Sequence, residues 1–447
     1  MLLRKRMSRS VSQWPRVKPS VLFNSIFCLK PTITYSTVVD SCLIIFTIIT
    51  AIPQSLISYC LFNIIVTENV MSTKDESIFA KEVLVGTKSG NEIIKQTLLR
   101  GKGYKQFSKY KQKAEQEFPE FARRLIVSLH KLITCDNNPS ETVTKFVAEV
   151  GSPELALDSK RISSIKSRLS NPEVLRDRIQ RILNSNFVKM TYPVFSALLD
   201  GASEYLKENN ISDEVKKSVI DGHIIAIDLS EPMDRIIDKD EDVEFLDDYK
   251  LLNPYMLEIA RQKIAQGGDH ILKTFEEGFK DAKTGQDIDL SLKIKPESIN
   301  YENMNECYKK YRAVMGTAGR NMALNHRLLG DIFYLGMAKA GECVGCGNEI
   351  EDAIKNGYIK IPSWPLYFSL NTNVKKGFAL TIRKSEIYLD EARLALEMLP
   401  EDFQLKPFLE FIFLTVSHYN NYWYNEVKRR SLFPNFQNQI NTAIKMK

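Results

Sequence analysis

Apolar residues recur every three or four positions along most of the chain, a period that is typical of helices with one buried face. A clear case spans residues 119–134, where one stripe holds Phe121, Leu125, Leu129 and Leu132. Another helix is predicted to begin after Asn171, a capping residue that precedes a proline at the first helical position. The same period predicts helices over residues 193–208, 213–226, 253–266, 302–315, 320–340, 386–399 and 407–428.

Alternation with a period of two, which is typical of strands, is confined to short stretches. Residues 288–294 alternate between apolar and polar side chains, and residues 358–361 and 378–382 are short apolar runs that suit a small hairpin. The pattern therefore predicts a mainly α fold, with two helical lobes and a minor β-hairpin element.

A run of acidic residues marks the predicted division between the lobes. Residues 228–248 contain ten Asp and Glu residues against Arg235 and Lys239, which is typical of a linker or an exposed loop. We predict an N-terminal lobe over residues 71–227, an acidic linker over 228–250 and a C-terminal lobe over 251–430. Residues 431–447 contain Pro434 and several Asn and Gln, and we expect them to form an arm that docks on a neighbouring copy.

The first seventy residues differ from the rest of the chain. They hold seven Lys and Arg against two acids, and residues 41–66 contain no charge at all. A bilayer-spanning helix needs roughly 20 mainly apolar residues, so this run has the length of a membrane span. An acid-poor leader rich in Arg and Ser also suits a mitochondrial targeting segment. A third reading is that Met71 is the true start and residues 1–70 are translated leader sequence.

Composition narrows the class of protein. The chain has 447 residues, of which 44% are hydrophobic and 26% charged, as in ordinary globular proteins. Its seven cysteines are scattered, which favours a reducing compartment over a disulfide framework. Cys343 and Cys346 form one CxxC without a second pair, so a metal site, a redox pair and two plain thiols all stay open.

Familiar catalytic patterns are missing from the sequence. No two of the five histidines stand three or four residues apart, and the glycine-lysine stretches do not have the spacing of a phosphate-binding loop. No nucleophile elbow or kinase signature is present either. We therefore expect a protein that is not an enzyme, with no cofactor, no catalytic residue and no bound metal.

Charge is segregated along the chain after the leader. Residues 71–190 carry 22 basic and 14 acidic residues, residues 191–300 carry 13 and 24, and residues 301–447 carry 19 and 15. Two basic parts around an acidic middle favour a polyanion as partner. The alternative is that these charges only solvate the outer faces of helices.

One basic stretch also contains aromatic residues. Residues 100–113 hold six cations around Tyr104, Phe107 and Tyr110, with no acid. Cations neutralise phosphates and aromatic faces stack on unpaired bases, so this combination suits single-stranded nucleic acid. The competing interpretation is that the three rings, spaced three residues apart, form the buried stripe of a cationic helix. The candidate binding residues in this stretch are Arg100, Lys102, Tyr104, Lys105, Phe107, Lys109 and Lys111.

Two further stretches are candidates for phosphate contact. Arg320 and Arg327 stand seven residues apart and are predicted to share one helix face. Near the C-terminal end, a dense aromatic run over residues 418–424 leads into Lys428, Arg429 and Arg430. Ordinary helix packing is the alternative for both stretches.

Two basic helical lobes, an acidic connection, basic-aromatic strips and extending ends together resemble the nucleocapsid proteins of negative-strand RNA viruses. The resemblance covers residues 71–447 and is carried by residues 100–113, the Arg320 and Arg327 pair and residues 422–430. It implies a viral coat protein that clamps single-stranded RNA between its lobes and forms homo-oligomers through terminal arms, in the cytoplasm or the virion.

The leading hypothesis is therefore an RNA-coating, self-assembling protein that binds single-stranded RNA by phosphate contacts. The alternative is a membrane-anchored or organellar helical adaptor, located in a membrane or a mitochondrion, that binds a protein partner. In that case residues 41–66 supply the membrane contact.

Overall fold

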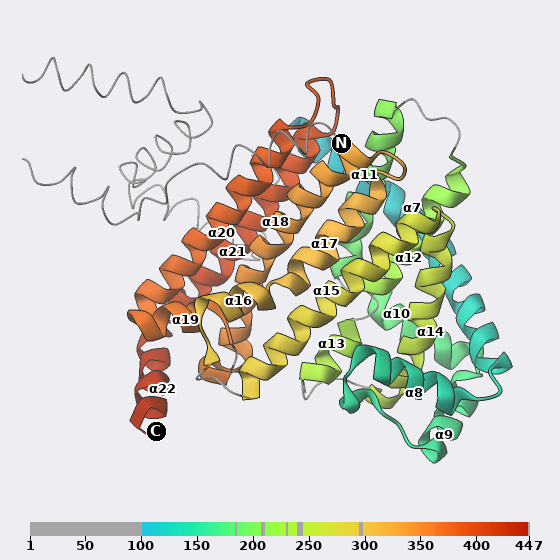
Figure 1. Cartoon of the computed structure of the whole chain (residues 1–447), viewed down its shortest axis with the longest axis horizontal. Helices are drawn as coiled ribbons and strands as arrows, with labels where there is room; N and C mark the ends of the chain where they lie inside the picture. The colour runs from blue at the N-terminus through green and yellow to red at the C-terminus, as the bar shows by residue number, and fades with distance from the viewer. Residues whose placement is uncertain are drawn as a thin grey trace, which may run out of the picture. The chain divides into compact units, whose positions relative to one another are not determined.

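The computed structural model describes residues 101–445 with gaps at 184–185, 207–210, 229–230, 239–244, 295–297 and 361. The predicted leader, its apolar run over residues 41–66 and Arg100 lie outside the described residues. Every regular element of the described part is helical (Figure 1). The mainly α prediction is thus confirmed. Among the described helices, none has the length and apolarity to cross a membrane.

The first half of the described chain contributes ten elements: α7 (Lys102–Cys135), α8 (Pro139–Val150), η1 (Pro153–Leu155), α9 (Ser159–Leu169), α10 (Pro172–Leu183), α11 (Asn186–Leu206), α12 (Asp213–Ile227), α13 (Glu231–Asp238), α14 (Leu246–Ala265) and α15 (Asp269–Ile294). The second half contributes α16 (Tyr301–Cys307), α17 (Lys309–Met322), α18 (Arg327–Asp352), η3 (Ala353–Gly357), η4 (Tyr358–Lys360), α19 (Trp364–Asn371), α20 (Val374–Glu397), α21 (Lys406–Arg429) and α22 (Phe433–Lys445).

Long helices lie side by side in the second half of the chain. In Figure 1, the axes of α15, α17, α18 and α20 are nearly parallel, and each helix packs on the next. Glycines permit two of these close approaches: a Cβ at Gly285 would lie 2.5 Å from the backbone nitrogen of Lys310, and one at Gly341 would lie 2.6 Å from the carbonyl oxygen of Tyr311.

The predicted β-hairpin is wrong. Residues 358–361 begin with η4, and residues 378–382 lie inside α20, where Phe378, Thr381 and Ile382 are buried at helical spacing. The strand-like run at 288–294 belongs to α15. The alternating pattern led to a wrong prediction of a strand because Asp289, a polar residue, is buried. The carboxylate of Asp289 lies 3.2 Å from both Lys293 and Lys310. A paired acid can occupy a core position that the pattern assigns to solvent.

The acidic stretch does not separate two bodies. Contacts group the described residues into one compact unit, and one hydrophobic core runs from Phe107 in α7 to Phe413 in α21. Within residues 228–250, α13 and the start of α14 fold into this unit. Asp248 is buried because Arg168 and Arg178 both bind its carboxylate, with Arg178 Nε 2.8 Å from Oδ2. Buried pairing, which composition does not reveal, explains why the predicted linker is not seen.

The predicted C-terminal arm is a packed helix. Residues 433–445 form α22, and Phe436 and Ile440 are buried in a second hydrophobic cluster (Figure 1, lower left). The ring of Phe436 stacks on Tyr358 at 4.7 Å and on Phe378 at 5.7 Å between centroids. The apolar period within 433–440 therefore anchors this segment to its own chain.

Candidate functional site

The aromatic residues of the first basic strip face the interior. Phe107 and Tyr110 are buried on α7, and Tyr104 lies with its edge toward Phe411 of α21, at 5.7 Å between ring centroids. Phe107 packs against Phe408 and Phe411 of the same helix. Phe107 and Tyr110 belong to the buried stripe of a cationic helix, so Phe107 presents no ring for a base to stack on, whereas Tyr104 is only partly buried.

The cations of that strip point to solvent. Lys102, Lys105, Lys109 and Lys111 are all exposed, and Lys102 Nζ lies 3.5 Å from Oε1 of Gln404. Acidic residues lie close to this end of α7. Lys113 pairs with Asp200 at 3.2 Å, and Asp402 stands two residues before Gln404. Acidic side chains thus stand near the strip, although no described carboxylate lies within 4.0 Å of the four lysines themselves.

Arg320 and Arg327 do not share a helix. α17 ends at Met322 and α18 begins at Arg327, and the turn between them contains Leu324 with a φ of 47°. Arg320 Nη2 lies 2.8 Å from Oδ1 of Asp331, and its guanidinium covers the ring of Tyr334. Arg327 is exposed at the first position of α18. The predicted common face is thus wrong, because Leu324 adopts a positive φ after α17 and His326 caps a new helix by accepting from the backbone N–H of Leu329.

The third candidate strip ends α21. Lys428, Arg429 and Arg430 are exposed, and both arginines bind the buried carboxylate of Glu426, at 2.7 and 2.9 Å. Hydrogen bonds from Arg429 and Arg430 lower the pKa of Glu426 below its usual value. Two guanidinium groups share a single carboxylate, so this cluster keeps a net positive charge. Lys428 adds a further cation, with Nζ 3.9 Å from the ring centroid of Tyr424.

Two segments without any acid converge at this end of the molecule. Residues 353–385 contain six Lys and Arg and no Asp or Glu, and residues 427–447 contain five and none. We call the surface formed by their described residues the basic end. The signal for this surface in the sequence is the absence of Asp and Glu from two long segments. A search for dense groups of cations does not detect it, so the sequence analysis missed this surface.

A hydrophobic cluster of its own holds the basic end together. Val374, Phe378 and Ile382 of α20 join Val427 of α21 and Phe436 of α22 in this cluster. The backbone N–H of Val374 also donates to Oε1 of Gln437 at 3.2 Å. The buried neighbours of the cations thus fix α20, α21 and α22 against one another.

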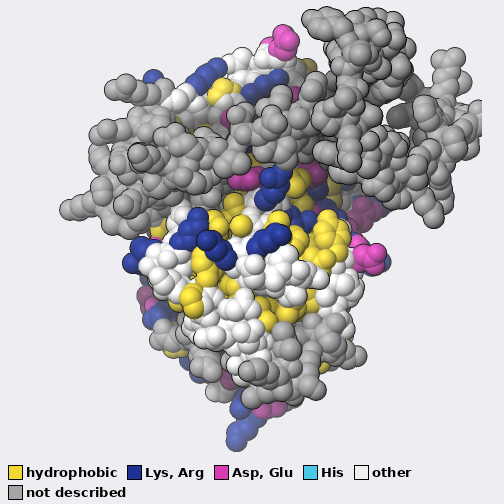
Figure 2. All heavy atoms as spheres, turned by 90° about the vertical axis from the view of Figure 1, so that its left-hand side faces the viewer, with side chains coloured by type: hydrophobic (Ala, Val, Ile, Leu, Met, Phe, Trp, Pro, Cys, Tyr) yellow, Lys and Arg dark blue, Asp and Glu magenta, His cyan; other side chains and the backbone are white. Residues whose placement is uncertain are grey.

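The surface above that cluster is positive and poor in acids. Lys375 and Lys376 are exposed on the first turn of α20, and no carboxylate of the described residues lies within 4.0 Å of either. Figure 2, which views the left side of Figure 1, shows Lys and Arg side chains gathered near the middle of this face beside hydrophobic ones. Lys355, which belongs to the same segment, pairs with Glu351 just outside it.

Neutral amides cover much of the outer side of α22. Asn435, Asn438 and Asn441 are exposed, and Gln437 and Gln439 are partly exposed. Amide side chains donate and accept hydrogen bonds without adding negative charge, as phosphate and sugar contacts require. The basic end therefore combines cations with uncharged donors.

One cation of the segment is held in a cage of rings. Lys384 Nζ lies 4.1 Å from the ring centroid of Trp364, 4.8 Å from Tyr388 and 4.9 Å from Tyr301. Its charge is stabilised by three aromatic faces instead of a carboxylate. Lys384 therefore anchors α20 to α16 and α19 on the inner side of the basic end.

A buried acid lies beneath this cage. Glu349 of α18 accepts a hydrogen bond from the backbone N–H of Trp364 at 2.9 Å. Burial raises the pKa of Glu349 to about 8, so the side chain is largely protonated at neutral pH. The interior below the basic end thus adds little negative charge.

The CxxC cysteines lie one turn apart on α18, where both are buried. Cys343 Sγ accepts from Asn420 at 3.3 Å, and Cys346 Sγ accepts from the hydroxyl of Tyr308 at 3.6 Å. Burial raises the pKa of Cys343 to about 12. Among the described residues, no group of three or more His, Cys, Asp or Glu is placed to hold a metal ion.

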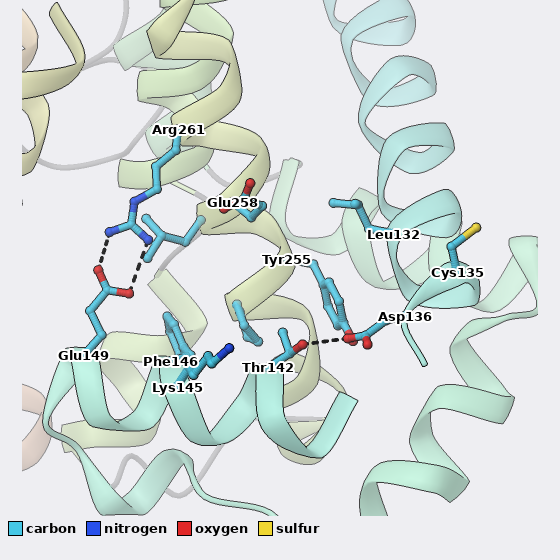
Figure 3. A pocket seen from close by; sticks show the side chains of 12 residues that line it. Leu132, Cys135, Asp136, Thr142, Lys145, Phe146, Glu149, Tyr255, Glu258 and Arg261 are labelled. Atoms are coloured by element: carbon cyan, nitrogen blue, oxygen red, sulfur yellow. Dashed lines mark hydrogen bonds and ion pairs between the residues drawn. The ribbon is translucent and has the colours of Figure 1, made fainter. Parts of the chain in front are cut away.

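A cleft of about 440 Å³ lies between α7, α8 and α14 (Figure 3). Tyr255 and Thr142 both donate to Oδ2 of Asp136, at 2.8 and 2.7 Å, and Arg261 binds Glu149. Because these polar groups satisfy one another across the cleft, they leave little hydrogen-bonding capacity for a ligand. The cleft is a weaker candidate than the basic end.

Comparison with known proteins adds little. No protein-family model matches the chain, and no curated protein matches it. A solved structure with a related arrangement is a geranyltranstransferase from Methanosarcina mazei, which is 13% identical. The match covers 64% of this chain and 99% of that chain, with a TM-score of 0.43. A likeness at that level supports no argument about activity.

Proposed function

We propose that this protein binds single-stranded RNA through its basic end. The observation that carries the proposal is the convergence of two acid-free segments, 353–385 and 427–447, on one hydrophobic cluster. The contacting cations are Lys375, Lys376, Lys428, Arg429 and Arg430. The lysines of 102–111 stay outside this set because Asp200 and Glu204 lie beside Tyr110, which belongs to the same part of α7. Arg320 is excluded because it pairs with Asp331, and Arg327 because it lies at the separate turn where α18 begins.

Binding depends on phosphate, not on base sequence. The five cations neutralise backbone phosphates and release their counterions, and the amides of α22 add hydrogen bonds to phosphate and sugar. This arrangement suits a protein that coats RNA, because such a protein can bind at any position along the strand.

Salt dependence tests the proposal. The logarithm of the association constant for a single-stranded RNA of mixed sequence is expected to fall against the logarithm of salt concentration with a slope of about −3.5, about −0.7 for each of five phosphates. The double variant Lys375→Gln/Lys376→Gln is expected to make that slope shallower by about 1.4 units. Thermal unfolding of the same variant provides the control for folding.

Three outcomes contradict the proposal. The first is an affinity that does not change with salt, and the second is a slope unchanged in the double variant. The third is binding to vesicles with anionic lipids without binding to RNA, which would assign the same cations to a membrane surface.

A further inference from the structure

A stripe of exposed apolar side chains follows two neighbouring helices. Of the eleven large hydrophobic residues that are exposed in the described part, four lie on α18 and α20 and a fifth directly follows α20. They are Leu328, Leu335, Ile387, Leu394 and Met398. Scattered exposed apolar residues are normal, whereas a continuous row marks a contact surface.

The two helices run antiparallel, which brings their exposed residues together. Gly336 of α18 packs against Ala392 and Ala395 of α20, and Cys343 lies by Ser385. Residues with increasing numbers on α18 therefore lie beside residues with decreasing numbers on α20. Leu335 therefore lies beside Leu394, and Lys339 pairs with Glu391 at 2.8 Å across the middle of the row.

Charge differs between the ends of this stripe. Arg383 is exposed one turn before Ile387, and no carboxylate of the described residues lies within 4.0 Å of it. At the other end, Glu397 and Glu401 are exposed on either side of Met398. Arg383, Ile387, Leu394 and Met398 fall on one face of α20, since each residue advances by about 100°.

We propose that this stripe is the contact between two copies of the chain, related by a twofold axis. A twofold axis across α20 reverses the helix direction, so Arg383 of each copy lies opposite Glu397 and Glu401 of the other. The exposed apolar residues of the two copies meet around the axis, where Leu335 and Leu394 flank the Lys339–Glu391 pair and are covered. The charged ends and the apolar residues of this surface both match those of an identical surface, which favours a second copy of the chain over an unrelated partner.

This inference does not rest on RNA binding, and its test uses the full chain without RNA. Sedimentation velocity over a range of concentrations is expected to show a dimer that dissociates on dilution. The double variant Leu335→Glu/Leu394→Glu is expected to raise the dissociation constant by about 100-fold or more, because it places like charges in the covered centre. Val127→Glu, at an exposed position on α7, is the matched control and leaves the dimer intact.

Charge reversal tests the orientation. Arg383→Glu alone is expected to weaken the dimer by about tenfold, and the addition of Glu397→Arg and Glu401→Arg is expected to restore it. A monomer at every concentration, a dimer that survives the double leucine variant, or a triple variant that is not restored would each overturn the proposal. Circular dichroism of every variant confirms that folding is retained.

Discussion

The start of α7 and the basic end are both rich in lysine and aromatic residues, but they differ in what surrounds those side chains. On α7, Phe107 and Tyr110 turn inward and Lys113 pairs with Asp200. At the basic end, Lys375 and Lys376 are exposed above a cluster built from acid-free segments. Under the proposed function, the comparison implies that a polyanion surface depends more on the absence of acids nearby in space than on the density of cations along the sequence.

The largest expected effect concerns the aromatic residues of α7. Phe107→Ala is expected to lower the free energy of unfolding by about 3 kcal/mol, because a buried ring against Phe408 and Phe411 is lost. RNA affinity of the folded variant should be unchanged. Chemical denaturation measures the free energy of unfolding, and filter binding measures the affinity for RNA. A variant that stays stable but loses RNA would restore the stacking role of this ring.

A second variant disrupts the helix packing beneath the basic end. A Cβ at Gly377 would lie 2.0 Å from Oγ and 2.7 Å from the backbone nitrogen of Ser369, so Gly377→Ala pushes α20 away from α19. We expect a loss of about 1–3 kcal/mol in unfolding free energy together with weaker RNA binding. Gly336→Ala is the matched control, since its Cβ has neighbours no closer than 3.7 Å. Equal effects of the two substitutions would contradict this account of the packing.

A third variant tests the neutral acid beneath the basic end. Burial raises the folded pKa of Glu349 to about 8 from an ordinary value of 4.5, so the folded protein binds more protons between these values. Its contribution to stability is therefore present below about pH 4.5 and is lost as the pH rises through 8. Glu349→Gln is expected to reduce the fall in stability between about pH 5 and pH 8 by roughly 1 kcal/mol or more. Identical pH profiles for the two proteins would show that Glu349 is ionised throughout.

The smallest effect sharpens the charge argument. Glu426 is the carboxylate that Arg429 and Arg430 share. Glu426→Gln removes this negative charge, so RNA affinity at low salt is expected to rise by about threefold, which is below 1 kcal/mol. The gain should vanish at high salt. A loss of affinity would mean that the carboxylate is needed to orient the two arginines.

Much of the helical fold could be predicted from the sequence. The stripe of Phe121, Leu125 and Leu129 is buried in α7, and the cap at Asn171 precedes α10. The errors arose where buried polar residues break the pattern. Asp289 is paired with two lysines inside the core and made a helix resemble a strand.

The site was harder to predict than the fold. Arg429 and Arg430 were candidates because a dense aromatic run leads into them, whereas Lys375 and Lys376, an adjacent pair without such a run, were missed. Their position matters because α21 and α22 pack against α20, although these helices begin 30 and 57 residues after Lys376. Likewise, sequence spacing alone did not show whether the rings of residues 104–110 face solvent or Phe411.

A matched charge reversal tests the central claim most directly. The triple variant Lys375→Glu/Lys376→Glu/Lys428→Glu is compared with Lys105→Glu/Lys109→Glu/Lys111→Glu, which makes the same change in net charge on α7. RNA affinity at one low salt concentration is expected to fall by about 100-fold or more in the first protein and by only a few-fold in the second. Equal losses in both would show that net charge alone determines binding, and a larger loss in the second would place the RNA on α7.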